Sequence, residues 1–491
     1  MKDFDKGKLC FEDGLKYLNK QDYQSAKLSF LKSLDLVPNR ISTIHNLINI
    51  FFFLKDKKEL DYLIIRYDHL KNENVLKLAK AFLSYLNNEI NNSLNFCDQI
   101  TCSKDDDIYY DLKKLYAKNY LKAGSFKESL KYYRKLLKLF KNDCIIYNEV
   151  GAFFQKLGKP HLAKIYYEKS LKLDRNDKAL YNLSMSLLKL NDYKKGFDLY
   201  EKRFQIQYGF KNLKSKIKIP GNIQELKNKT VCVFDEQGIG DTFQFLRFVK
   251  LISTMGCKVI LCTRTSLVDF FNLISWNVQV EDKENLYLIE ADFFIPIISL
   301  AKLFNVNCNS VPVVKFNLKN QNLDKKNFPK NKLNIGFSYQ GNPNFDNDNY
   351  RSLSPSYLSK YFQDKQIRFY QLSEVNIKKK DYFDILDNDL VRLDNIPFAK
   401  LYHYLTELDL IFTVDTSIAH YCGILGIKFY LLLNFNSHWN WFDSTSTSTW
   451  YPSATIIKQK KINDWSTVLK EVDFVINSSK SNNKISNKII N

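Results

Sequence analysis

The first 205 residues repeat one pattern of apolar and small residues about every 34 positions. The clearest copy is GLKYLNKQDYQSAKLSFLKSLDLVPN, residues 14–39. The same register returns in repeats that begin near residues 110, 144 and 177. A period of this length is typical of stacked helix pairs, because one pair cannot bury its apolar face alone. The pattern therefore predicts that this part of the chain is all helix, in antiparallel pairs.

Small and aromatic residues occupy fixed places in the clearest copy: Gly14, Tyr17, Ala26, Phe30, Ser33 and Pro38. These offsets fit the 34-residue tetratricopeptide pattern, in which small residues lie where two helices cross closely. Two weaker copies are projected to begin near residues 41 and 75, which gives about six helix pairs over residues 1–205. Such an array forms a superhelix whose concave face binds extended partners. We therefore expect a protein or peptide partner on that face.

The pattern changes after Phe204 to short apolar runs that alternate with helical stretches. Residues 206–229 are interpreted as a linker, because they contain Pro220 and Gly221. The strand candidates that follow are TVCVF (230–234), KVILC (258–262), DFFIPI (292–297), LNIGFS (333–338), RFYQLS (368–373), LDLIFTV (408–414) and KFYLLL (428–433). Alternating strands and helices predict parallel sheets built from βαβ units.

A polar stretch at residues 317–332 separates the strand candidates into two groups, which predicts two Rossmann-like halves at 230–325 and 326–476. The fold class expected for the whole chain is therefore α + α/β. The tail from 477 to 491 is polar, so we expect it to be disordered.

Composition narrows the classes of partner. The net charge is +20, from 73 Lys and Arg against 53 Asp and Glu, which would suit nucleic acid, an anionic membrane surface or a phosphorylated ligand. The basic residues are scattered and no nucleic-acid module is recognisable, so we expect no nucleic-acid partner. Apolar runs such as LINIFFFL (47–54) are too short to span a bilayer, which leaves only peripheral membrane contact.

The cysteines and the N-terminus indicate a cytoplasmic protein. The nine cysteines are scattered without a CxxC pair, so the sequence suggests neither a zinc site nor a disulfide framework. We interpret them as free thiols in a reducing compartment. The first residues, MKDFDKGKLCFEDG, lack the apolar stretch of a signal peptide.

The first segment with candidate chemistry is FDEQGIGDTFQFLRF (234–248), which follows a strand candidate and opens a helix pattern. Gly238 and Gly240 permit a sharp turn at the carboxyl end of the strand, where open α/β sheets bind ligands. The third glycine of a dinucleotide fingerprint is replaced by Phe243, and no phosphate-loop Lys follows. Two roles stay open for Asp241, a helix cap or a carboxylate presented to a substrate.

The second segment is SYQGNPNFDNDNYRSLS (338–354). Gly341 and Asn342 begin a turn, and Arg351 is suited to bidentate contact with phosphate oxygens. The triplet Asp346-Asn347-Asp348 resembles the metal-binding motif of some sugar-nucleotide enzymes. Such acidic loops are more often solvated turns, so we expect no metal.

The third segment is LIFTVDTSIAHYCGILG (410–426), in which a strand ends at Val414 and a helix follows Asp415. Thr416 and His420 are four residues apart, so they share one helix face. The free backbone N–H groups at this helix start suit a diphosphate. His420 is either a ligand-binding residue or a structural one.

Together these segments resemble a known family, the bacterial tetratricopeptide-repeat proteins whose C-terminal half is similar to heptosyltransferase-like glycosyltransferases of family nine. The ordered motifs lie between about 225 and 470 and are EQGIGDTFQFLRF (236–248), GFSYQGNP with Arg351 and Ser352, VDTSIAHYCGILGIKFYLLL (414–433), HWNWF (438–442) and WYPS (450–453). The chain departs from the family at Tyr339 and Gln340, where relatives have Trp and Ser, and at STSTST (444–449), which replaces a charged segment.

The resemblance implies the GT-B fold and an inverting transfer of a sugar from a nucleotide sugar, without a metal or other cofactor. It implies that Asp241 is the general base and that the acceptor binds the half at 230–325. The donor-binding residues implied in the second half are Gly341, Asn342, Arg351, Asp415, Thr416, Ser417 and His420. Further cleft candidates are Glu236, Gln237, Gly238, Gly240 and Gln244.

The charge that develops during such a transfer supports these roles. A nucleoside diphosphate leaves with growing negative charge, so a helix N-terminus and cations should stabilise it. One helix end supplies roughly 0.3–1 kcal/mol, so several donors must act together, and Arg351 and His420 are the candidates. A positioned carboxylate that accepts the acceptor's proton contributes on the order of 10²–10⁴ in rate.

Three functions remain open from the sequence. The leading hypothesis is a glycosyltransferase whose repeats select a protein acceptor, by analogy with the O-linked N-acetylglucosamine transferases. The second is a non-enzymatic scaffold, with repeats that bind a partner and a degenerate transferase domain. The third is a transferase that acts on a lipid-linked glycan at a membrane surface.

Overall fold

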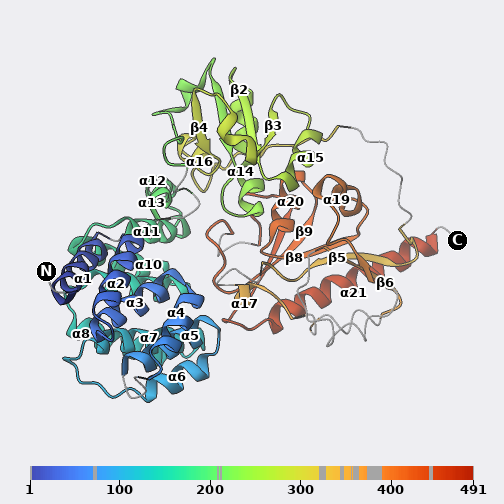
Figure 1. Cartoon of the computed structure of the whole chain (residues 1–491). Helices are drawn as coiled ribbons and strands as arrows, with labels where there is room; N and C mark the ends of the chain where they lie inside the picture. Colours follow the sequence, from blue (N-terminus) through green and yellow to red (C-terminus); the bar gives the residue numbers. More distant parts are fainter. Residues whose placement is uncertain are drawn as a thin grey trace. The chain divides into compact units, whose positions relative to one another are not determined.

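The computed structural model describes residues 3–20, 22–69, 74–206, 210, 213–319, 328–342, 348–354, 357, 364–372, 390–441 and 446–489 (Figure 1). The chain divides into two compact units, Met1–Phe153 and Phe154–Asn491.

The first unit is built from helices alone within the described residues, as the repeat pattern predicts. Consecutive helices pack as hairpins, with α1 against α2, α5 against α6 and α7 against α8. The helices are α1 (Asp3–Asn19), α2 (Tyr23–Leu36), α3 (Ile41–Leu54), α4 (Lys57–Arg66), α5 (Asn74–Leu86), α6 (Ile90–Asp98), α7 (Ile108–Lys122) and α8 (Phe126–Leu139), and α9 (Cys144–Lys156) crosses the boundary between the units.

Close helix crossing explains the small residues of the repeat. A Cβ atom added at Gly14 would lie 2.6 Å from the ring of Phe30, which is fully buried on the facing helix. Gly196 makes the same kind of contact in a later repeat, with an added Cβ 2.7 Å from the side chain of Leu188. A larger residue at either place would push the two helices apart.

A buried carboxylate links two repeats of the first unit. Asp111 of α7 accepts hydrogen bonds from Asn49 (2.8 Å) and Lys114 (3.0 Å) and lies 3.0 Å from Nε2 of His45. Burial alone would raise the pKa of the Asp111 carboxyl, but Lys114 and His45 outweigh it and hold the pKa well below its ordinary value. Because His45 and Asn49 belong to α3, this carboxylate fastens α3 to α7.

The second unit contains the end of the repeat pattern and both sheets. Its first helices are α10 (Pro160–Leu173), α11 (Asp177–Lys189), α12 (Tyr193–Tyr200) and α13 (Arg203–Ile206), and a short 3₁₀ turn, η2 (Ile223–Leu226), lies within the stretch interpreted as a linker. Tyr193, Phe197 and Tyr200 of α12 share one hydrophobic cluster with the strands and helices that follow. This shared core explains why α10–α13 belong to the same compact unit as the sheets, although the repeat pattern continues to residue 205.

The first sheet has four parallel strands in the order β3-β2-β1-β4. The strands are β1 (Thr230–Phe234), β2 (Lys258–Thr263), β3 (Gln279–Asp282) and β4 (Phe293–Pro296). The connections are α14 (Ile239–Ser253), α15 (Thr265–Leu273) and η3 (Lys283–Leu288), and α16 (Ser299–Leu303) follows β4.

The second sheet has six parallel strands in the order β10-β9-β8-β5-β6-β7. The strands are β5 (Leu333–Ser338), β6 (Ile367–Gln371), β7 (Leu390–Arg392), β8 (Leu410–Val414), β9 (Phe429–Leu433) and β10 (Ala454–Lys458). The helices are α17 (Asp348–Arg351), α19 (Phe398–Leu405), α20 (Ser417–Leu425) and α21 (Ser466–Ile489). Ser338 pairs with Thr413, so β5 and β8 end side by side.

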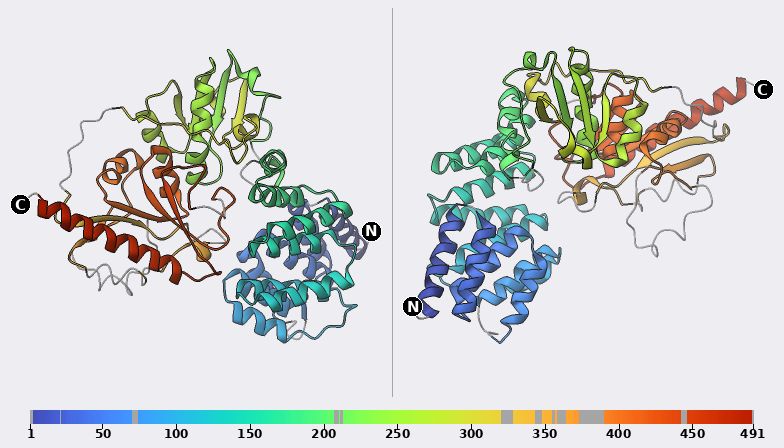
Figure 2. Two further views of the ribbon diagram at one scale, coloured as in Figure 1. Left: turned by 180° about the vertical axis from the view of Figure 1, so that it is seen from behind. Right: turned by 45° about the horizontal axis from the view of Figure 1, so that its top comes forward.

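The predicted fold class, helical repeats followed by parallel sheets with helices, is confirmed. Two details differ from the sequence-based expectations. The strand candidates omit β3, β7 and β10, because these strands are short or carry polar residues. The tail from residue 477 is expected to be disordered, whereas α21 continues through it to Ile489 (Figure 2). Ile476 is buried, so apolar contacts reach almost to residue 477 before the polar sequence begins.

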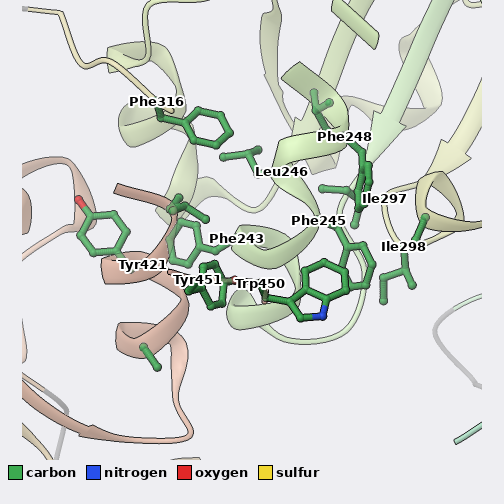
Figure 3. Close-up of a cluster of buried hydrophobic side chains, with 14 of the residues drawn as sticks. Phe243, Phe245, Leu246, Phe248, Ile297, Ile298, Phe316, Tyr421, Trp450 and Tyr451 are labelled. Atoms are coloured by element: carbon green, nitrogen blue, oxygen red, sulfur yellow. The ribbon is translucent and has the colours of Figure 1, made fainter. Parts of the chain in front are cut away.

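An aromatic core joins the two sheets where α14 packs against α20. Phe243 of α14 lies 5.2 Å from the ring of Tyr421 on α20 and 5.0 Å from Phe398 on α19, measured between ring centroids. Tyr451 and Trp450, which precede β10, lie beside the same cluster (Figure 3). Helices α14 and α20 therefore pack against each other on one continuous hydrophobic core.

Arg203 offers a test of how firmly the repeats are joined to the first sheet. Its guanidinium is fully buried and donates to both carboxylate oxygens of Glu236, at 2.6 and 2.7 Å. We expect Arg203→Met to lower the free energy of unfolding by about 3–5 kcal/mol, because it leaves a buried carboxylate without its partner. Urea titration followed by circular dichroism measures this loss.

Arg66→Met serves as the control, because Arg66 forms an exposed ion pair with Asp35 at 3.7 Å and should cost less than about 1 kcal/mol. Equal losses for the two variants would contradict the role given to Arg203.

Candidate functional site

Two acidic residues of the first segment anchor the turn after β1. The Asp235 carboxylate is fully buried, and it accepts from Nε of Arg264 (2.7 Å) and Nζ of Lys283 (2.8 Å). Burial would raise the pKa of Asp235, but Lys283 and Arg264 together hold it below its ordinary value. Asp235 thus fixes the carboxyl ends of β1, β2 and β3 to one another.

Glu236 is expected to face the cleft, and the structure corrects this. The Glu236 side chain turns away into the protein, where it pairs with Arg203 and accepts from the backbone N–H of Ile298 at 3.0 Å. Gln237 also faces a repeat helix, because its amide bonds the hydroxyl of Tyr200 at 2.9 Å. The Glu236 side chain is buried away from any cleft, and both side chains hold the turn against the repeats.

Asp241 carries out the capping role that the sequence leaves open. It occupies the third position of α14, and its Oδ2 atom accepts from the backbone N–H of Gly238 at 2.9 Å. Burial raises the pKa of the Asp241 carboxyl, and Asp415 adds to the rise, while His438, the Gly238 N–H and Arg264 oppose it. A carboxylate with a raised pKa is also a better proton acceptor, so capping does not remove the second role.

The two halves approach closely at Gly240. A Cβ atom added there would lie 2.7 Å from Cδ2 of His420 on α20, closer than real Cβ contacts allow. The glycine therefore serves this close contact, and its backbone does not require a left-handed conformation. The contact brings the first turn of α14, which carries Asp241, against His420 of α20.

The second and third segments also meet. Arg351 donates to the backbone carbonyl of Asp415 at 2.9 Å and, through Nε, to Asp348 at 2.8 Å. The same two side chains, Arg351 and Asp348, lie directly against the Cα of Gly341, so no side chain would fit at that position. Thr416 lies 3.2 Å from the hydroxyl of Ser338 at the end of β5. The carboxyl ends of β5 and β8 thus bring the predicted donor-binding residues together.

Two more of the predicted donor residues lie at the edges of this group. Asn342 is exposed, and residues 343–347 after it lie outside the described part of the chain. Asp346 and Asn347 of the acidic triplet fall in that gap, while Asp348 is bonded by Arg351 and Ser352. Ser417 is half-buried and opens α20. Among the described residues, no group of three or more His, Cys, Asp and Glu side chains is arranged to hold a metal.

His420 is not the cation that the sequence leads us to expect. Its imidazole is buried, its Nδ1 lies 2.8 Å from the hydroxyl of Tyr451, and its Nε2 lies 3.9 Å from Oδ1 of Asp415. Burial lowers the pKa of His420 to about 4, against the opposing effect of Asp415 and with help from His438, Arg247 and Arg351. The ring is therefore neutral at pH 7 and acts through hydrogen bonds.

The structure adds site residues that the sequence does not single out. Trp441 packs on His420 with ring centroids 4.9 Å apart, and Asn440 donates to Oε1 of Gln244 at 2.8 Å. Gln244 is a predicted cleft residue, but it is fully buried and connects the two halves through this bond. His438 of the same segment acts on the pKa of both Asp241 and His420. In the sequence, the polar and aromatic run HWNW (438–441), which closely follows a strand, could have pointed to these residues.

Arg247 is a buried cation beside this group. It donates to the backbone carbonyls of Gln244 and Pro312, both at 3.0 Å, and its guanidinium lies over the rings of Trp450 and Tyr451 at 5.0 Å. Burial lowers the pKa of Arg247, although Tyr451 opposes the change. Its charge contributes to keeping His420 neutral.

Among the comparisons with known proteins, a family model identifies a tetratricopeptide repeat. The family model described as tetratricopeptide repeat matches residues 146–177. A search of curated proteins found no match. Similar solved structures include the anaphase-promoting complex hetero-tetramer Cut9–Hcn1 (17% identity, 39% of this chain, 37% of that chain, TM-score 0.36), the type IV pilus biogenesis factor PilW (16%, 43%, 97%, 0.32) and PilF of Pseudomonas aeruginosa (14%, 43%, 98%, 0.29). This chain thus covers less than half of the Cut9–Hcn1 chain.

All nine cysteines are free thiols in the structure. Within the described residues, every helix is too short or too polar to cross a bilayer.

Gly240→Ala tests the close contact between the halves. We expect a loss of about 1–3 kcal/mol in the free energy of unfolding, because the added methyl group must displace the buried ring of His420. Gly221→Ala is the matched control, since the added methyl group meets only the flexible side chain of Glu225 on the surface. Thermal unfolding of the three proteins measures the difference, and an unaffected Gly240→Ala variant would show that the halves do not meet there.

The low pKa of His420 predicts an acid-sensitive fold. An unfolded histidine has a pKa near 6.5, so below that pH protonation favours the unfolded chain until the folded pKa of about 4 is reached. The stability due to neutral His420 is therefore complete above pH 6.5 and should fall by roughly 3 kcal/mol on acidification to pH 4. His420→Gln should reduce this dependence when unfolding is measured between pH 4 and 7. The exposed His161→Gln should keep it, and a dependence unchanged in His420→Gln would refute the assignment.

Proposed function

We propose that the chain is a glycosyltransferase that moves a sugar from a nucleotide sugar to an acceptor hydroxyl, with a protein as the acceptor. The observation that carries the proposal is the contact of Gly240 with His420. It brings a carboxylate of the first sheet to the helix start that follows β8 in the second. Ligands of open parallel sheets bind at the carboxyl ends of strands, and here two such ends face one site.

The residues divide the chemistry between the halves. Asp241 would accept the proton of the acceptor hydroxyl, while the hydroxyl oxygen forms a bond to the anomeric carbon and the bond from that carbon to the diphosphate breaks. The diphosphate would lie at the start of α20, where backbone N–H groups near Thr416 and Ser417 are directed at it. Arg351 supplies positive charge beside Asp415.

His420 has a different role in this proposal from the cationic one that the sequence suggests. A neutral ring cannot balance the charge of the leaving diphosphate, so that task falls on Arg351 and on the helix N-terminus. His420 would instead donate or accept a hydrogen bond at the donor, held in place by Tyr451 and Trp441. No step in this mechanism requires a metal or other cofactor, in line with the family resemblance.

The repeats support a protein acceptor. The tetratricopeptide model matches residues 146–177, and repeats of this kind present extended surfaces to protein segments. The last repeats are tied to the first sheet through Arg203 and Tyr200, so a segment bound along them would lie on the same compact unit as the site.

A protein-binding scaffold without transfer activity is the second candidate. The observation in its favour is that Asp241 already caps α14 by accepting the N–H of Gly238, so a structural role accounts for the residue. The repeats would then be the functional part, and the two sheets would serve as a second binding module.

Asp241→Asn separates these functions. Asparagine keeps the size of the side chain and its capping oxygen, and removes only the basicity of the carboxylate. If transfer occurs, kcat should fall by about 10²–10⁴ while nucleotide-sugar affinity stays within a few-fold, because the base does not hold the donor. A panel of nucleotide sugars in a thermal-shift screen first identifies the donor, and turnover and calorimetry follow with that donor.

Asp269→Asn is the matched control, since it makes the same change at an exposed position on a helix of the same half. Near wild-type turnover in Asp241→Asn would make Asp241 a cap and nothing more. A wild-type protein that binds no nucleotide sugar, and yet binds a protein through its repeats, would establish the scaffold.

A further inference from the structure

The segment 434–441, here named the His438 segment, runs from the end of β9 across the surface of the last repeats. Asn436 donates its side-chain amide to the backbone carbonyls of Gln155 (2.8 Å) and Lys156 (3.2 Å) at the end of α9. Phe435 and Asn436 also lie against Gly158, where an added Cβ would stand 3.4 Å from the ring. The amino end of the segment is therefore fastened to the turn between α9 and α10.

Lys189 at the end of α11 is bound to the middle of the segment. Its Nζ donates to the backbone carbonyl of Ser437 at 2.7 Å, to the Ser437 hydroxyl at 3.1 Å and to the carbonyl of His438 at 3.4 Å. An ammonium group has three N–H donors, and three oxygens of one short segment lie within reach of this one. Its flexible stem thus holds two consecutive residues of the segment.

Trp439 packs the next residue of the segment into the repeats. Its ring lies 5.6 Å from the centroids of both Tyr193 and Phe197 on α12, with interplanar angles of 88°. Edge-to-face pairs of this kind are worth about 0.5–1.5 kcal/mol each beyond their burial. Trp450 also contacts this helix, because its indole N–H donates to the hydroxyl of Tyr193 at 3.3 Å.

The remaining side chains of the segment face the site. Asn440 bonds Gln244 of α14, Trp441 packs on His420, and the His438 ring is held by Asn440 at 3.0 Å from its Nδ1. Residues 436–439 of this segment therefore contact the repeats, and residues 440–441 contact the candidate site. Displacement of the first set of contacts must move the second.

We propose that Lys189 is a positioning residue of the transfer site, because it holds the His438 segment, whose residues Asn440 and Trp441 contact Gln244 and His420. The last repeat is then part of the site, in addition to selecting an acceptor. This inference rests on the proposed transferase function for the meaning of Asp241, while the mechanical link stands on the contacts alone.

The surroundings of Asp241 explain why the position of His438 affects the pKa of Asp241. Burial and Asp415 raise the pKa of Asp241, and His438, the backbone N–H of Gly238 and Arg264 lower it. The hydroxyls of Tyr200 and Tyr451 are the other titratable groups that interact with the Asp241 charge, and both stay protonated because burial raises their pKa values. A His438 ring that leaves its place would therefore leave Asp241 with a higher pKa.

Hydrogen–deuterium exchange of the full chain without ligand tests the mechanical link. We expect Lys189→Met to speed amide exchange of residues 434–441 by about tenfold or more, since it removes charge-assisted bonds but keeps the apolar stem. Lys195→Met is the matched control, because Lys195 is largely exposed on α12 and its Nζ lies 3.9 Å from its ion-pair partner Asp192. Lys189→Arg, which retains a cation with several donors, should stay within about threefold of the wild type.

The pH profile of turnover tests the positioning role. The acidic limb of kcat/KM reports the pKa of the base, so we expect it to move to higher pH in Lys189→Met. Asn436→Ala should produce the same direction of shift without a change in net charge, which separates the position of His438 from the loss of a cation. It also serves as the second variant if Lys189→Met does not fold.

The outcomes separate this inference from the proposed function. Unchanged exchange in both Lys189→Met and Asn436→Ala would overturn the mechanical link. Faster exchange with an unmoved acidic limb, in a protein that turns over, would overturn the positioning role. A wild type without turnover on any nucleotide sugar would overturn the proposed function and, with it, the effect on Asp241, whatever the exchange rates show.

Discussion

The contact between Gly240 and His420 is the constraint on which the candidate site depends. A single added methyl group would meet the imidazole at 2.7 Å, so α14 and α20 can approach only because position 240 has no side chain. Beneath this contact, Phe243 packs against Tyr421 and Phe398 and holds the two helices at that separation. The proposed chemistry depends on this arrangement, because it brings the first turn of α14, which carries Asp241, against His420 of α20.

The repeats and the sheets form a joint structure in the second unit. Arg203 pairs with Glu236 on the side of the first sheet, and Lys189 bonds Ser437 on the side of the second. Helices that would be expected only to bind a partner thus hold both sides of the site. The buried pair of Arg203 and Glu236 is costly to break, because removal of one partner leaves a buried charge uncompensated.

The sequence predicted the fold better than the site. The 34-residue repeat predicted the helices of the first part of the chain. Seven apolar runs predicted strands that the structure contains, because buried parallel strands are almost wholly apolar. Strands such as β7, with three residues, carry no such signal. The roles of Asp235 and Glu236 could not be read locally, since their partners Lys283 and Arg203 lie far away in the chain.

The charge state of the site was also beyond sequence reasoning. The sequence suggests a cationic His420, but the surrounding side chains bury its ring and hold it neutral. The motif HWNWF was recognised, but no role was assigned to His438, because its position depends on contacts between Lys189 and the segment's backbone. A crystal structure of the full chain with a bound nucleoside diphosphate would test the central claim most directly. The proposed mechanism predicts diphosphate oxygens within hydrogen-bonding distance of the Thr416 and Ser417 amides and beside Arg351, whereas a diphosphate bound elsewhere, or no binding at millimolar concentration, would contradict it.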